Sequence, residues 1–250
     1  MASTVTYTYY HAGPLFTLSD LHTNTLLASR IRSLSNGRFI PIVPQDLEQR
    51  DTSPHSIRDQ DIRSLLTCDL ALFTYDGAEL DSGTVVEYML AKFADIPCVI
   101  LRTDFRKAGD QGESGGGDPW NLMSSFWPRT TKVVVDSMLS YKQGLAKALE
   151  QRNVPDSKVE NVTSFDVGGG PVALAAGQGL LDKVAGQVVA AMEEVVKVPA
   201  RMPKEVRGSV YEWLALMPGF KSQGGSRVET ETEVKDMLEL LKAKEEKGML

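Results

Sequence analysis

Short apolar runs alternate with stretches of helical periodicity over residues 5–151, and this alternation restricts the fold more than any other feature. The runs are too short for buried helices and therefore predict strands. We expect strands at 5–11, 39–43, 69–74, 96–101 and 132–135, and helices at about 19–34, 57–66, 82–93 and 138–151. Strands separated by helices pair in parallel, because each helix returns the chain to the same edge of the sheet. The predicted fold class is α/β: a five-stranded parallel sheet flanked by helices, a three-layer arrangement of the flavodoxin-like or Rossmann-like kind.

A polar, glycine-rich stretch at residues 156–170 separates this pattern from a different one. Beyond it the sequence predicts only helices, at about 174–198, 205–216 and 229–246. We therefore expect two parts, an α/β domain of residues 1–155 and a helical C-terminal extension of residues 156–250. The apolar stripe of the first of these helices is typical of packing on the core or on a partner subunit.

Composition argues against several kinds of partner and cofactor. The net charge of −6 offers no basic surface for a nucleic-acid polymer or an anionic membrane. The N-terminus lacks the segments of a signal peptide and no apolar run approaches a membrane span, so we expect a cytoplasmic protein. Cys68 and Cys98 have neither metal-ligand nor redox spacing. No metal and no cofactor are predicted, because no metal cluster, dinucleotide fingerprint or Ser-His-Asp order is present in the sequence.

The candidate site lies where the third predicted strand passes into the helix at 82–93. Asp76-Gly77 is typical of a turn, Asp81 is typical of a helix cap, and Glu87 lies one to two turns into the helix. In an open parallel sheet, ligands bind at this carboxyl end of the strands. A partly buried carboxylate there suits a nucleophile or a base. The alternative is that Asp81 is only a cap and Glu87 only a solvated helix residue.

Four separated motifs support the functional interpretation. They are Tyr10-x-Ala12-Gly13-Pro14, Asp61 eight residues before the strand-opening Asp69, Asp81-Ser82-Gly83-Thr84-x-x-Glu87, and Asn121-Leu122-Met123. With this ordered set the chain resembles the nucleoside 2-deoxyribosyltransferase family over about residues 5–150. The C-terminal extension departs from that family's usual, shorter domain.

The resemblance implies an enzyme that transfers 2-deoxyribose between nucleobases, with deoxynucleosides and free bases as substrates. It assigns the nucleophile to Glu87, through a covalent glycosyl ester. Base recognition and proton transfer fall to Asp81 and Asp61. Asp59 and Asp69 stay open as alternatives to Asp61.

Further positions are expected to shape the site. The Tyr10 hydroxyl should hydrogen-bond Glu87 and keep it ionised. Gly13 and Gly77 give the sugar and the base room, and Ser82, in the first turn of the helix, is a further substrate-binding candidate.

The resemblance places Asn121 in a neighbouring subunit's site, on the sugar 5′-hydroxyl, which implies a homodimer or a higher homo-oligomer with shared sites. Two other functions stay open. Related deoxynucleotide N-hydrolases use water as the acceptor and hold a 5′-phosphate with a small hydroxyl residue in this region. Ser124 and Ser125 are the candidates for that residue, and Arg129 is a candidate partner of the phosphate. A non-catalytic module that senses nucleosides or nucleotides is the third possibility.

Overall fold

The computed structural model describes residues 5–47, 53–106, 110–111, 117–150, 170–220 and 227–250. Five strands form one sheet: β1 (Tyr7–Ala12), β2 (Phe39–Ile42), β3 (Leu70–Thr74), β4 (Cys98–Arg102) and β5 (Thr130–Val134). All neighbouring strands are parallel, in the order β2-β1-β3-β4-β5. The predicted five-stranded parallel sheet is therefore confirmed.

Helices occupy most of the remaining described chain. They are α1 (Leu18–Leu34), α2 (Pro54–Thr67), α3 (Ser82–Phe93), α4 (Ser137–Glu150), α5 (Gly170–Val195), α6 (Lys204–Leu214) and α7 (Arg227–Glu246), with short 3₁₀ turns η1 (Pro44–Asp46) and η2 (Leu122–Ser124). No helix in the described ranges is both long enough and apolar enough to cross a membrane. The predicted linker at 156–170 lies almost wholly outside the described residues, so the division into 1–155 and 156–250 stays a prediction.

Local chemistry explains where α1 begins and ends. Thr17 and Asp20 form a capping box, in which each side chain accepts a hydrogen bond from the other's backbone N–H. The helix therefore begins slightly before its predicted start. After it, Asn36 and Gly37 adopt positive φ angles of 53° and 76°, which turn the chain into β2.

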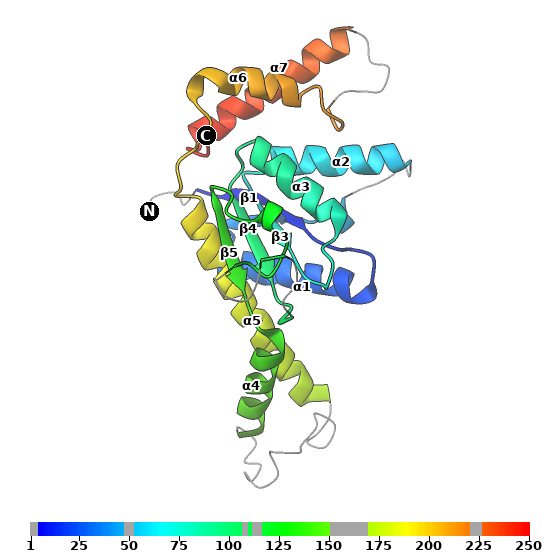
Figure 1. Ribbon diagram of the computed structural model, residues 1–250, viewed down its shortest axis with the longest axis vertical. Helices are drawn as coiled ribbons and strands as arrows, with labels where there is room; N and C mark the ends of the chain where they lie inside the picture. The colour runs from blue at the N-terminus through cyan, green and yellow to red at the C-terminus, as the bar shows by residue number, and fades with distance from the viewer. Residues whose placement is uncertain (1–4, 48–52, 107–109, 112–116, 151–169, 221–226) are drawn as a thin grey trace.

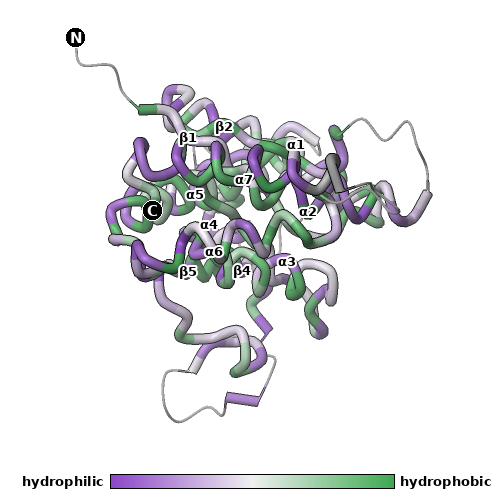
Figure 2. Tube along the Cα trace, turned by 90° about the horizontal axis from the view of Figure 1, so that it is seen from above, coloured by the Kyte–Doolittle hydropathy of each residue, from purple (hydrophilic) through white to green (hydrophobic). Residues whose placement is uncertain are grey.

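Helices cover both faces of the sheet (Figure 1). Successive side chains of a strand point alternately toward these two faces. Tyr9 and Leu72 belong to an apolar cluster shared with α1 and α5, whereas Tyr10 and Phe73 belong to a cluster shared with α2 and α3. Helices α6 and α7 lie beyond α2 and α3 and extend the second cluster (Figure 1). Along the helices the trace alternates between hydrophobic and hydrophilic residues, as burial of one side requires (Figure 2).

The C-terminal residues close the amino edge of the sheet, where the strands begin. Lys244, near the end of α7, is buried and donates to a backbone carbonyl oxygen just before β3. Lys247 forms an ion pair of 2.8 Å with Asp69, and Arg129, just before β5, donates to the Met249 carbonyl oxygen over 2.7 Å. The charged side chains of this edge thus tie the end of the chain to the sheet.

Candidate active site

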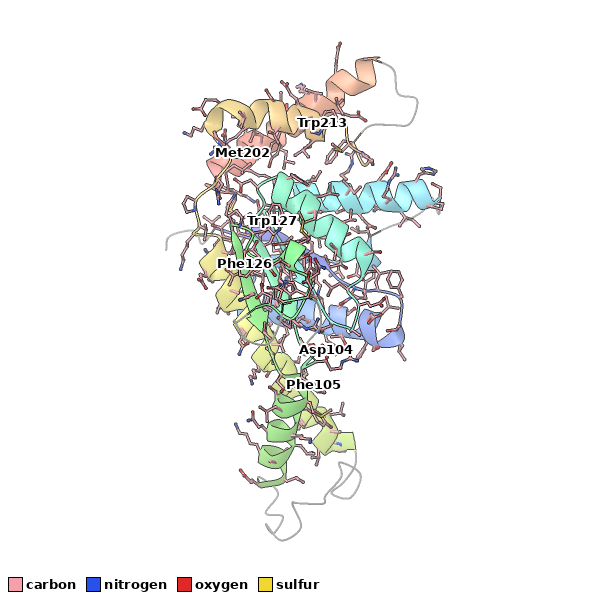
Figure 3. All side chains as sticks on the ribbon, viewed as in Figure 1. Asp104, Phe105, Phe126, Trp127, Met202 and Trp213 are labelled. Atoms are coloured by element: carbon pink, nitrogen blue, oxygen red, sulfur yellow. The ribbon has the colours of Figure 1, made fainter. Side chains whose placement is uncertain are left out.

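The predicted site residues lie toward the opposite, carboxyl edge of the sheet, where the strands end. Asp104 and Phe105 follow β4 at this edge, and Figure 3 shows them on the side of the sheet away from Met202, just before α6, and Trp213 on α6. In parallel sheets this edge is the usual place for ligands.

A tyrosine and a glutamate meet between β1 and α3. Asp81 caps α3, its Oδ2 accepting a hydrogen bond of 2.7 Å from the Thr84 N–H, and this fixes where the helix begins. Glu87 follows about one and a half turns later. The Tyr10 hydroxyl donates to Glu87 Oε1 over 2.6 Å. The hydrogen bond expected between these two side chains is therefore present.

Burial sets the acidity of this pair. Burial, with smaller contributions from the charges of Asp61 and Asp81, raises the pKa of Glu87 from 4.5 to about 7, although the hydrogen bond from Tyr10 lowers it. Burial, together with the charge of Glu87, also raises the pKa of the Tyr10 hydroxyl, which keeps it protonated as a donor. Glu87 is thus a poorly solvated carboxylate that ionises near neutral pH, as a nucleophile or a base requires.

Asp61 on α2, a helix that contacts α3, supplies a second, partly buried acid. Its charge contributes to the raised pKa of Glu87. Burial raises the pKa of Asp61 itself to about 6, and its buried Oδ1 accepts no hydrogen bond from any described residue. The two alternatives are engaged elsewhere, Asp59 with Arg58 at 2.7 Å and Asp69 at the amino edge. A buried acceptor without a donor is suited to bind the N–H group of a ligand.

Asp81 combines the two roles that the sequence left open. Its Oδ2 accepts from both the N–H and the hydroxyl of Thr84, at 2.7 and 2.8 Å, so it is a helix cap. Its Oδ1 has no hydrogen-bond partner in the described part of the chain, and its charge contributes to the raised pKa of Glu87. One oxygen therefore holds the helix, and the other is available to a ligand.

The small residues of the prediction lie at turns of the same edge. A Cβ on Gly13 would lie 3.1 Å from Thr74 Cβ, a tight contact that glycine avoids. Gly77 has a φ of 102°, a conformation that side chains other than glycine rarely adopt. Ser82 is exposed in the first turn of α3.

Asn121 is the predicted site residue that the single chain does not bring to the acids. It is exposed and caps η2, its Oδ1 accepting a hydrogen bond of 2.9 Å from the Met123 N–H. Neither Glu87 nor Asp61 is among its hydrogen-bond partners in the described chain. Met123 and Phe126 beside it are each 75% exposed, so an apolar surface surrounds this position.

The candidate phosphate ligands are unsuited to that role. Arg129 lies at the amino edge, buried and paired with Asp95 at 3.2 Å, so the expectation that it binds a phosphate at this site is wrong. Ser124 and Ser125 are buried, and their hydroxyls are hydrogen-bonded to neighbouring side chains at 3.3 and 2.6 Å. Within the described ranges, no three His, Cys, Asp or Glu side chains form a potential metal site.

Sequence reasoning missed Arg102, which is fully buried at the end of β4. Its guanidinium donates to the Tyr75 carbonyl oxygen over 2.5 Å and to that of Gly77 over 3.3 Å. The Asp76 carboxylate in turn accepts from the Thr103 N–H over 2.6 Å. These bonds hold the turn that leads into α3. The sequence signal that could have identified it is an arginine that directly follows the apolar run of β4.

The segment that carries these residues matches a known protein family. Residues 9–123 match the family described as Nucleoside 2-deoxyribosyltransferase, and this segment contains every predicted site residue. No curated protein matches the chain. Among solved structures, a conserved protein from Enterococcus faecalis V583 is 20% identical, with a TM-score of 0.42, over 76% of this chain and 99% of that chain. A 2-desoxiribosyltransferase from Leishmania mexicana is 24% identical, with a TM-score of 0.40, over 58% of this chain and 97% of that chain.

Proposed function

Because residues 9–123 belong to the nucleoside 2-deoxyribosyltransferase family, we propose that this protein transfers 2-deoxyribose from a deoxynucleoside to a free nucleobase, with Glu87 as nucleophile. One observation supports this most strongly: two partly buried acids, on the neighbouring helices α2 and α3, have no cationic partner among the described residues. Glu87 accepts a hydrogen bond from Tyr10, and Asp61 Oδ1 accepts none. Burying unpaired acids is unfavourable for folding, which favours a role for them in binding and catalysis.

The reaction takes two steps. In the first, the ionised Glu87 carboxylate forms a bond to the anomeric C1′ while the bond from C1′ to the base breaks, and Asp61 or Asp81 gives a proton to the departing base. In the second, a ring nitrogen of the incoming base attacks C1′, the ester bond breaks and Glu87 leaves as a carboxylate. The proton displaced from the incoming base returns to the acid. Water must be kept away so that the ester waits for a base.

Tyr10 is the proposed positioning residue for Glu87. Its hydroxyl holds Oε1 at 2.6 Å and leaves Oε2 without a hydrogen bond among the described residues, free to attack C1′. The same bond opposes the effect of burial on the pKa of Glu87, so that more of the carboxylate is ionised at neutral pH. We assign Gly13, Gly77 and Ser82 to the walls that receive the sugar and the base.

We further propose that Asn121 completes the site of a second subunit, on the sugar 5′-hydroxyl. The exposed apolar side chains around it, Leu122, Met123 and Phe126, support an interface there. Mixing the inactive variants Glu87→Ala and Asn121→Ala after reversible dissociation tests this. Random exchange would restore one intact site in each mixed dimer, hence about a quarter of wild-type activity. No recovery in mixtures that sedimentation shows to have exchanged would contradict shared sites.

Base exchange tests the activity itself. The purified protein is incubated with deoxyinosine or thymidine plus free adenine, beside the isosteric Glu87→Gln variant, and the products are separated by chromatography. Deoxyadenosine formed by the wild type alone supports the proposal. Free base without a new nucleoside indicates hydrolysis and contradicts transfer, and deoxynucleoside monophosphates become the next substrates. No product from any of them favours the sensing module.

A further inference from the structure

A cavity of about 580 Å³ lies on the face of the sheet opposite Glu87. Its walls are α1, α5 and the carboxyl ends of β3 and β4, and its lining is mostly apolar, with Leu27 from α1, Leu101 from β4 and Leu181 from α5 among its residues. Helix α5 lies outside the matched residues 9–123, so the wall that it supplies is an addition to the family segment. Cavities of this size and lining are typical of small-molecule sites.

Small residues of α5 keep this space open. Gly177 lines the cavity, and a Cβ added there meets nothing within 4 Å. Gly179 on the same helix also has open space around it, but it is exposed and does not line the cavity. The two glycines therefore differ in whether a larger side chain would enter the cavity.

The polar end of the cavity presents an unused acceptor. Asn24 is 8% exposed, and its Nδ2 donates over 3.0 Å to the Pro14 carbonyl oxygen, which can only accept. This fixes the orientation of the amide. Asn24 Oδ1 receives no hydrogen bond from the described chain, and neither does the Thr74 hydroxyl, which also lines the cavity. Asn24 Oδ1 is therefore an accessible acceptor on a mostly buried side chain, and a donor on a ligand in the cavity can reach it.

The charge of the lining restricts the ligand further. Among the described residues, no lysine, arginine or histidine lines the cavity, and Asp76 is the one charged residue of the lining. The Asp76 carboxylate already accepts from the N–H and hydroxyl of Thr103, both at 2.6 Å, and from the Asp104 N–H at 2.9 Å. An anion would meet a negative charge without a cationic partner, and a cation would meet a carboxylate that is already engaged.

We propose that this cavity binds a neutral, mostly apolar ring compound that carries one hydrogen-bond donor for Asn24 Oδ1. The site is separate from the candidate active site, because its wall residues Leu27 and Leu101 belong to the cluster on the α1 and α5 face. Tyr10, which donates to Glu87, belongs to the cluster on the α2 and α3 face. The inference therefore holds or fails independently of the proposed transferase activity.

Calorimetric titration of the full-length protein tests it with two probes of one shape. These are 2-naphthol, neutral at pH 7, and 2-naphthoate, which is anionic. Gly177→Leu inserts a side chain into the cavity, and Gly179→Leu is the matched control, because it makes the same gain in helix propensity on the same helix. Ala173→Leu, from the same wall, replaces Gly177→Leu if that variant does not fold.

We expect 2-naphthol to bind saturably at one site. Its affinity should be at least about tenfold lower in Gly177→Leu and unchanged in Gly179→Leu and in Glu87→Gln. We expect the affinity for 2-naphthoate to be at least about tenfold lower than the affinity for 2-naphthol. No saturable binding, equal binding to the two leucine variants, or preference for 2-naphthoate would overturn the proposal. So would loss of binding in Glu87→Gln alone, because it would assign the probe to the candidate active site.

Discussion

The two edges of the sheet both bury charged side chains, and they differ in how those charges are satisfied. At the amino edge, Asp69 accepts from the Thr8 N–H and pairs with Lys247, both at 2.8 Å. At the carboxyl edge, Glu87 accepts from one tyrosine hydroxyl, and the buried Oδ1 of Asp61 accepts nothing from the described residues. The acid of the first edge is paired within the chain, whereas the acids of the second leave acceptors for another molecule.

The difference separates structural charges from functional ones. Burial lowers the pKa of Lys244 to about 8, and the charge of Asp69 opposes that effect, so the amino edge compensates its own desolvation. Burial of Glu87 and Asp61 raises the pKa of both carboxyls, and no cation among the described residues offsets it. Burial alone therefore does not identify a site, and a cluster of shielded acids without a cationic partner is the stronger indication.

The largest expected effect is on catalysis at the carboxyl edge. Glu87→Gln keeps the shape of the side chain but cannot form the glycosyl ester, so we expect base exchange to fall about 10⁴-fold. The measurement is kcat/KM for exchange, with the folded fraction checked by circular dichroism. Activity within tenfold of wild type would remove Glu87 from the mechanism.

The same variant should be more stable above neutral pH. The pKa of Glu87 in the folded protein, about 7, exceeds its ordinary 4.5, so the folded wild type binds an extra proton between these values. Wild-type stability relative to the variant therefore falls as the pH rises from 4.5 to 7. Discounted for partial solvent contact, Glu87→Gln should gain about 2 kcal/mol in urea unfolding at pH 8 and nothing at pH 4. A variant less stable at pH 8 contradicts this.

The opposite result is expected at the amino edge. Asp69→Ala leaves the donors of Thr8 and the ammonium of Lys247 without their partner, so we expect a loss of about 3 kcal/mol in urea unfolding. Activity per folded molecule should stay near wild type. Lys235→Ala is the control, because its ion pair with Glu239 is exposed at 3.9 Å and contributes less than about 0.5 kcal/mol. Loss of activity in folded Asp69→Ala would contradict a purely structural role for the charges of the amino edge.

Asp61 and Asp59 provide a sharper test within one helix. Asp61→Asn removes a partly buried acid whose charge acts on Glu87, whereas Asp59→Asn removes one that pairs with Arg58. We expect kcat/KM for base exchange to fall about 100-fold in the first variant and less than about threefold in the second. Equal losses in the two variants would mean that Asp61 is no better a candidate for the acid than Asp59.

The fold was accessible from the sequence because each element carries its own periodicity. The run Leu70–Thr74 and the helix Ser82–Phe93 lie where strand and helix patterns predict them, with Asp81 as the cap between them. The pairing of Tyr10 with Glu87 also followed from motif positions, since strand ends and helix starts share one edge. Choosing Asp61 over its neighbours needed the structure, because the rotation of α2 depends on packing.

The remaining errors have one physical cause: partners distant in sequence. Arg129 follows Ser125 closely in the chain, yet β5 begins just after it, which places it at the amino edge against Asp95. Arg102 and Asn24 are held by backbone carbonyl oxygens of loops, and no residue spacing encodes such partners. Hydrogen bonds to loop carbonyl oxygens can be predicted only when the conformation of the loops is known.

Tyr10 offers the smallest effect and the most specific one. Its hydrogen bond lowers the pKa of Glu87, so Tyr10→Phe should raise that pKa and move the rise of activity with pH from about 7 to a higher value. We expect about a tenfold loss of kcat/KM at pH 7 that shrinks at pH 9, where the variant's glutamate is also ionised. Tyr9→Phe is the matched control, because Tyr9 points to the other face, with its hydroxyl 3.5 Å from His11 Nδ1. If both variants keep the wild-type profile, the hydroxyl does not tune Glu87. If Tyr10→Phe loses activity equally at every pH, the Tyr10 hydroxyl orients the Glu87 carboxylate without changing its pKa.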